Sequence, residues 1–368
     1  MATKKRKDGR YMRRFTINGK RFFVYGKTDK ECRENEAQKR KEIEQGLYKS
    51  GKELTVAEFF KRWIVSRQNV KQTTLRTYNN LFSMIQSAPP IDSTGKRFID
   101  LKLSDVETQY VRDLQQAIKN GRTTTSVNMA IDLLKTLFKD ALNERLIIWN
   151  PCAAVRTLKR EEPAASDGIH RALTIEETRR FLDYAADSWY FDLFVFLLNT
   201  GCRIGEAGAI TNKDVSDDFI YIKRTITCTE NGQRIIGDDT KTKSGQRSIP
   251  LNNSARSAIK RQRQKNAAFF NAFEINENRR VFRALKGGLI NGAYVNENID
   301  RICKAAGIKR FSVHALRATF ATRCIEGGMQ PKTLQEIMGH SNIAITMNLY
   351  THIMDETKTE QMQVVNFY

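Results

Sequence analysis

The sequence predicts a multidomain, mainly α-helical protein with small β-sheets. Its 368 residues allow two or three domains, and a hydrophobic content of 40% is enough for buried cores. Thr28, Thr55 and Thr174 are each followed three residues later by a glutamate, the capping-box pattern of a helix N-terminus. A polar stretch that contains proline and glycine, residues 158–168, indicates a linker between domains.

The N-terminal segment, residues 1–50, predicts a small β-rich module with one helix. Two basic and aromatic strands, 13–17 and 21–25, are joined by an Asn-Gly pair, which is a strong hairpin signal, and a helix follows over about 28–47. Residues 1–30 hold 11 Lys or Arg against 2 Asp. Such a hairpin suits a sheet that enters a DNA groove, and a solvated charged hairpin is the alternative.

Residues 53–158 are expected to be all-helical. Apolar residues recur at helical spacing after Thr55 and along the last of the expected helices. We expect helices from Thr55, over 74–85, from Ser104-Asp105 and over about 125–146. The last is expected to stop at Trp149-Asn150-Pro151.

The remaining residues, 169–368, predict a mainly helical domain with one small sheet. The mostly apolar residues 191–198 are expected to form a buried helix that Gly201 should end. Strands are expected over 218–222 and 247–251, with a basic turn, 241–246, between them.

The net charge and the positions of the cysteines narrow the range of possible functions. The formal net charge is +21 and the pI about 9.8, which favour a polyanionic partner over an inert basic surface. Nucleic acid fits better than a membrane, since no basic amphipathic helix with a bulky apolar face stands out. No apolar run approaches the roughly 20 residues of a membrane-spanning helix. No secretory signal is expected, because the basic start lacks an apolar segment after it. The six cysteines are scattered, which argues against zinc and for a reducing cytoplasm.

Three short motifs bring cationic and hydrogen-bonding residues toward one tyrosine. The first, Thr200–Glu206, carries Arg203 at a junction of two helices, where an arginine can bind phosphate or simply pair with Glu206. The second holds His314 and Arg317 at a spacing that puts both on one helix face.

The third motif is the most specific signal in the chain. It runs from Gly339-His340 to Tyr350-Thr351-His352. A lone tyrosine is normally structural, but this one shares its motif with a Gly-His pair and an intervening threonine.

Together the three motifs resemble the active site of the tyrosine recombinase (phage integrase) family. The resemblance implies six catalytic residues: Arg203, Lys241, His314, Arg317, His340 and Tyr350. The lysine is expected in the turn of a hairpin, where Lys241 is preferred and Lys243 is its alternative. Glu206 would support Arg203. The family often has histidine at the position of Ala318, which we interpret as a tolerated change.

The resemblance also implies a domain order and a mechanism. Residues 1–50 would be a β-sheet-plus-helix arm-binding module, 53–158 a SAM-like helical core-binding domain, and 169–368 a mixed α+β catalytic domain with a C-terminal tail. Tyr350 would attack a scissile phosphate and form a 3′-phosphotyrosine, with no cofactor and no metal. This agrees with a sequence that has no P-loop and no metal-ligand cluster.

The expected partners follow from the same resemblance. They are double-stranded DNA at arm and core sites, a homotetramer on paired sites, and accessory excision or DNA-bending factors, with no membrane, in a bacterial cytoplasm and associated with the nucleoid. The protein would be an integrase of a phage or conjugative transposon. The alternatives are a Xer-type resolvase, a non-catalytic DNA-binding regulator and a topoisomerase-like nicking enzyme.

Overall fold

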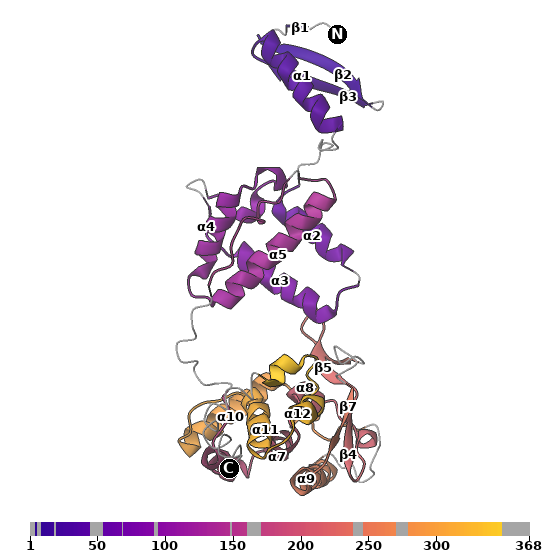
Figure 1. Cartoon of the computed structure of the whole chain (residues 1–368), viewed down its shortest axis with the longest axis vertical. Coiled ribbons are helices and arrows are strands. Elements are labelled where there is room, and N and C mark those ends of the chain that lie inside the picture. Colours follow the sequence, from indigo (N-terminus) through magenta and orange to yellow (C-terminus); the bar gives the residue numbers. More distant parts are fainter. Residues whose placement is uncertain are drawn as a thin grey trace, which may run out of the picture. The chain divides into compact units, whose positions relative to one another are not determined.

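The computed structural model describes ten stretches of the chain, which form parts of two compact units, Met1–Glu162 and Pro163–Tyr368 (Figure 1). The described residues are 4–5, 9–17, 20–44, 54–67, 69–91, 95–147, 149–159, 171–237, 246–269 and 279–347. The first unit contains two separate hydrophobic clusters, one around Phe15 and one spanning residues 56–155. None of the helices in these stretches is long and apolar enough to cross a membrane. The expected mainly helical architecture with small sheets is confirmed.

The N-terminal residues form the expected hairpin with a helix beside it. The strands β1 (Lys4–Lys5), β2 (Tyr11–Ile17) and β3 (Lys20–Gly26) make an antiparallel sheet in that order, and α1 (Asp29–Glu44) contacts it. In β2 and β3, Phe15 and Val24 face α1, whereas Arg14 pairs with Phe23 on the exposed face. The expected end of the helix, near Leu47, lies outside the described residues.

The next residues form a four-helix core with two short 3-10 turns. The elements are α2 (Val56–Ser66), α3 (Gln72–Gln86), η1 (Phe98–Asp100), η2 (Leu103–Asp105), α4 (Thr108–Lys119) and α5 (Thr124–Asn143). The capping box at Thr55 is present as predicted.

Two predicted boundaries in this region are wrong. Ser104-Asp105 lies in η2 and the third helix begins only at Thr108. The main chain just before η2 is held extended, because the main-chain oxygen of Leu101 accepts from Val56 and the N–H of Leu103 donates to Leu54. The fourth helix ends at Asn143, about three residues before the expected end near Leu146, because Arg145 adopts a left-handed conformation with φ 57°; the expected stop at Trp149-Asn150-Pro151 therefore does not end it.

The second unit is mainly helical and carries two small sheets. Its helices are α6 (Ile175–Ala185), α7 (Phe191–Thr200), α8 (Ile204–Ala207), η3 (Asn212–Asp214), α9 (Asn253–Phe269), α10 (Gly292–Ala306), α11 (Val313–Glu326) and α12 (Pro331–Met338). The strands β4 (Phe219–Ile222) and β7 (Arg247–Pro250) pair as predicted. A second antiparallel pair, β5 (Thr225–Cys228) with β6 (Arg234–Gly237), corrects the expectation of a single sheet.

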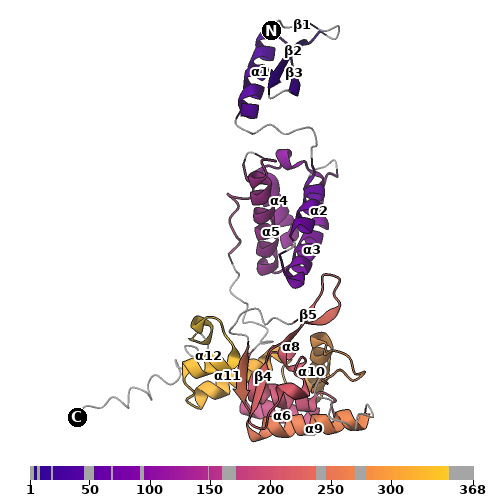
Figure 2. The same cartoon turned by 90° about the vertical axis from the view of Figure 1, so that its right-hand side faces the viewer.

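The additional hairpin projects from this unit and is anchored on α8 (Figure 2). A Cβ atom on Gly205 would lie 2.8 Å from the Thr225 hydroxyl oxygen, so only glycine allows this approach. The hairpin had a signal in the sequence, because Asn231-Gly232 separates two β-prone segments.

Gly201 ends α7 as predicted, and its substitution tests how tightly α7 and α11 pack. It has φ 62°, and a methyl group there would overlap the ring of Phe320. We expect Gly201→Ala to lower the free energy of unfolding, measured with urea, by more than about 2 kcal/mol, since left-handed strain and overlap add. Gly328→Ala is the matched control, with φ 77° and nothing within 4 Å. Equal losses in both variants would contradict the packing described.

Candidate active site

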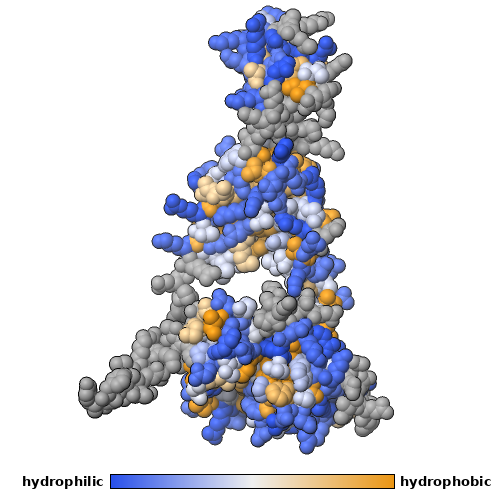
Figure 3. All heavy atoms as spheres, turned by 45° about the vertical axis from the view of Figure 1, so that its right-hand side comes forward, coloured by the Kyte–Doolittle hydropathy of each residue, from blue (hydrophilic) through white to orange (hydrophobic). Residues whose placement is uncertain are grey.

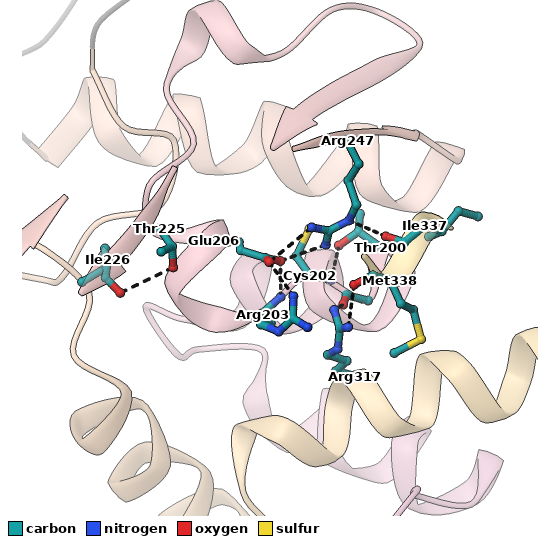
Figure 4. A network of polar contacts seen from close by, with 11 residues as sticks. Thr200, Cys202, Arg203, Glu206, Thr225, Ile226, Arg247, Arg317, Ile337 and Met338 are labelled. Atoms are coloured by element: carbon teal, nitrogen blue, oxygen red, sulfur yellow. Dashed lines mark hydrogen bonds and ion pairs between the residues drawn. The ribbon is translucent and has the colours of Figure 1, made fainter. Parts of the chain in front are cut away.

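Arg317 joins the two parts of the candidate site. Its guanidinium donates to the main-chain oxygen of Gly201, before α8, and to that of Met338, at the end of α12, over 2.5 and 2.6 Å (Figure 4). The side chain is buried in α11. The first and third motifs are therefore held on either side of Arg317.

The carboxylate of Glu206 binds two further guanidinium groups, those of Arg203 and Arg247. This carboxylate is 3% exposed, accepts from Arg203 Nη1 at 2.8 Å and from Arg247 Nη2 at 2.9 Å, and also accepts from the main-chain N–H of Arg203. Burial alone would raise the pKa of Glu206, but hydrogen bonds and charge from Arg247 and Arg203 outweigh it and lower that pKa. Glu206 is thus an ionised, buried support for both arginines.

Arg247 was not anticipated from the sequence. Its side chain is 6% exposed, and its Nε donates to the main-chain oxygen of Ile337 at 2.6 Å. Its partners are 41 and 90 residues away in the chain, so no local pattern could indicate it. Arg247 connects β7 to α8 and to the last turn of α12.

Replacing Arg247 with methionine is expected to lower the free energy of unfolding by about 3 kcal/mol or more, because a buried carboxylate loses a main partner. Urea unfolding measures this. Arg310→Met is the control, since Arg310 pairs with Asp300 while 67% exposed and should contribute no more than about 1 kcal/mol. A loss at Arg247 no larger than that of the control would refute its supporting role.

These arginines leave a surplus of positive charge. Among the described residues, the guanidinium groups of Arg203 and Arg247 pair with the carboxylate of Glu206, and the guanidinium group of Arg317 lies near enough to interact electrostatically with this pair (Figure 4). We call the three arginines the cationic cluster. Burial, followed by repulsion from Arg203, lowers the pKa of Arg317 to about 10, so it stays charged near neutral pH. Arg203 is 42% exposed and therefore open to a ligand. Such a site suits an anion with several oxygen atoms.

His340 lies beside the cationic cluster. Gly339, with φ 63°, ends α12, and the main chain of His340 exchanges two hydrogen bonds with Gln335, one to its main-chain oxygen and one from its side chain. The ring Nδ1 is 2.9 Å from the Thr346 hydroxyl. Burial, with repulsion from Arg317 and Arg203, lowers the pKa of His340 to about 4, so the ring is neutral near pH 7.

The depressed pKa of His340 predicts a pH dependence of stability. A histidine in the unfolded chain binds a proton below about pH 6.5, whereas His340 in the folded protein binds one only near pH 4. The free energy of unfolding therefore decreases as the pH is lowered from about 6.5 to 4. Between pH 7 and 5 the loss should be about 2 kcal/mol. Urea unfolding at both values, on the protein and on His340→Gln, measures it. Identical pH dependence in the two proteins would contradict the assignment.

The structure brings three of the six predicted residues together: Arg203, Arg317 and His340. His314 lies exposed on the first turn of α11, one turn before Arg317. Lys241, its alternative Lys243 and Tyr350 lie outside the described residues. The helix that follows Arg203 is only four residues long. The positive charge of the site therefore comes mainly from the guanidinium groups and not from the helix N-terminus.

Sequence comparisons identify the class of protein that this fold and site define. A sequence model of the phage integrase family matches residues 171–357, more than half of the chain. The chain therefore belongs to the phage integrase family, and it is a site-specific DNA recombinase of the tyrosine class.

Among its relatives are recombinases of mobile elements. The chain is 28% identical to the transposase from transposon Tn916 of Enterococcus faecalis, over 98% of this chain and 93% of that protein. It is 27% identical to a XerC-like tyrosine recombinase of Caldanaerobacter subterraneus subsp. tengcongensis, over 98% and 97%. Similarity to both groups covers almost the whole chain.

Solved structures of integrases have folds similar to that of this chain. The Tn1549 transposon integrase in complex with a circular intermediate DNA is 26% identical, with a TM-score of 0.68 over 85% of this chain and 100% of that one. A lambda integrase tetramer bound to a Holliday junction has a TM-score of 0.59 over 94% of each chain and, at 19% identity, shows the shared fold.

Proposed function

We propose that the cationic cluster and His340 bind the scissile phosphate of double-stranded DNA, and that the protein integrates and excises a mobile element. The observation that carries this proposal is the surplus of positive charge around Glu206, with Arg203 still partly exposed. A phosphodiester in a trigonal-bipyramidal transition state presents the oxygen atoms that such guanidinium groups bind best.

The chemistry proposed for this site is covalent and reversible. The Tyr350 oxygen attacks the phosphorus, a phosphotyrosyl bond to the 3′ phosphate forms, and the bond to the 5′ oxygen breaks. Lys241, with Lys243 as the alternative, protonates the departing oxygen. His314 helps to remove the tyrosine proton or positions the phosphate, and His340 donates a hydrogen bond to the phosphate. A 5′-hydroxyl from another strand then reverses the step, so neither ATP nor a metal is required.

The three predicted domains would divide the DNA between them. Residues 1–50 would bind arm sites through the exposed sheet face, where Arg14, Phe23 and Tyr25 lie together. Residues 53–158 and 169–368 would enclose core sites. On the face seen in Figure 3, most of the described surface is hydrophilic. The net charge of +21 favours binding to the phosphate backbone.

The assembly proposed on DNA is a homotetramer on two paired sites. Accessory excision or DNA-bending factors would set the direction of recombination. The bacterial cytoplasm, at the nucleoid, is the proposed location.

A duplex with a nick near the cleavage site tests this proposal. Cleavage releases a short downstream fragment that carries the new 5′-hydroxyl, and once this fragment diffuses away the covalent complex cannot reverse and is trapped. We expect a protein–DNA adduct on a denaturing gel, and exchanged products between two marked sites. DNA binding without adduct would favour the non-catalytic regulator. An adduct without exchange would favour the topoisomerase-like enzyme. A Xer-type resolvase would recombine chromosomal dimer sites in preference to the ends of an element.

A further inference from the structure

The hydroxyl of Thr346 is buried and hydrogen-bonded to His340. Its side chain is completely buried, and the one hydrogen bond that its hydroxyl makes within the described part of the chain joins Oγ1 to His340 Nδ1 at 2.9 Å. A hydroxyl group carries one hydrogen, and buried donors are almost always satisfied. The Thr346 hydroxyl therefore donates to Nδ1.

That direction determines which nitrogen of His340 carries the proton. A neutral imidazole has one N–H; if Nδ1 accepts from Thr346, the proton must be on Nε2. The opposite arrangement would leave the Thr346 hydrogen without an acceptor among the residues that the structure describes. It would also turn a lone pair of Nε2 toward any phosphate oxygen. Burial, together with the charges of Arg317 and Arg203, lowers the pKa of His340 and keeps the ring neutral, so the choice of tautomer matters near pH 7.

We propose that Thr346 is a positioning residue that fixes His340 as the Nε2–H tautomer, so that the ring donates a hydrogen bond to the scissile phosphate. The inference rests on the proposed function of His340. It adds a residue whose hydroxyl links the histidine to the segment that leads, four residues later in the sequence, to Tyr350.

The site has the features that such fixing requires. Gln335 holds the main chain of His340 through two hydrogen bonds, so the remaining freedom is that of the ring. Thr346 fixes that ring from the Nδ1 side. Outer partners of this kind on metal-bound histidines change activity by about 10- to 100-fold when removed.

The test compares Thr346→Val, which keeps the shape, with Thr346→Ser, which keeps the hydroxyl. Covalent-complex formation on the nicked duplex should slow by about 10- to 100-fold in Thr346→Val and recover to within a few-fold in Thr346→Ser. Equal rates for the protein and Thr346→Val would overturn the proposal. Failure of the unmodified protein to form any complex would instead count against the proposed function.

A spectroscopic measurement keeps the proposal testable even if Thr346→Val folds poorly. Nitrogen-15 NMR of the histidine rings in the unmodified protein, with His340→Gln identifying the signal, should show an Nε2–H tautomer at pH 7. A proton on Nδ1 would overturn the proposal. In folded Thr346→Val, a mixture of tautomers should appear.

Discussion

Tyr350→Phe is expected to abolish covalent-complex formation and strand exchange, by on the order of 10⁴-fold or more. Phenylalanine lacks the only atom that can form the phosphotyrosyl bond, while the cationic cluster and the rest of the DNA-binding surface stay intact. DNA affinity, measured by gel shift at fixed salt, should therefore change little. The nicked duplex measures the loss of adduct.

Tyr294→Phe is the matched control for this variant. Tyr294 lies exposed on α10 of the same unit, so its hydroxyl can be removed without effect on the proposed chemistry. Adduct formation by Tyr350→Phe at more than a trace level would show that another residue is the nucleophile.

The second large effect is expected from Arg317→Lys, which should reduce the cleavage rate by about 10²- to 10³-fold. The groups that donate to Gly201 and Met338 are the two terminal nitrogens, Nη1 and Nη2, of one planar guanidinium, and a lysine ammonium cannot reproduce that geometry. The variant should lose both the contact between the two motifs and a donor to the phosphate. Single-turnover cleavage of the nicked duplex measures it.

Arg323→Lys, on the same helix, is the control for Arg317→Lys. Arg323 pairs with Glu326 and contacts Leu173 away from the cationic cluster. If both variants cleave at similar rates, Arg317 would have no special role in the reaction.

The sequence predicted those parts of the fold that local signals determine. Helix starts at Thr55 and Thr174 carry their capping boxes, and the strand pairs β2–β3 and β4–β7 form as expected. The predicted start of α4 was wrong, because Lys102 pairs with Thr55 in an antiparallel β-bridge and this pairing overrides the local helical pattern. Contacts of this kind between distant segments leave no periodic trace.

The same distinction applies to the candidate site. Arg203, Arg317 and His340 lie in extended motifs and were found from the sequence, and the structure brings them together. Arg247 was missed because its role depends on Glu206 and on the main chain of Ile337, far away in the sequence. The sequence showed Thr346 only as a threonine within the third motif. Its hydrogen bond to His340 could be identified only from the folded structure.

The most direct measurement of the central claim is to digest the adduct trapped on the nicked duplex and identify the modified peptide by mass spectrometry. We predict that Tyr350 carries the nucleotide, linked through its 3′ phosphate. An adduct on another residue, or a link to a 5′ phosphate, would contradict the proposed reaction.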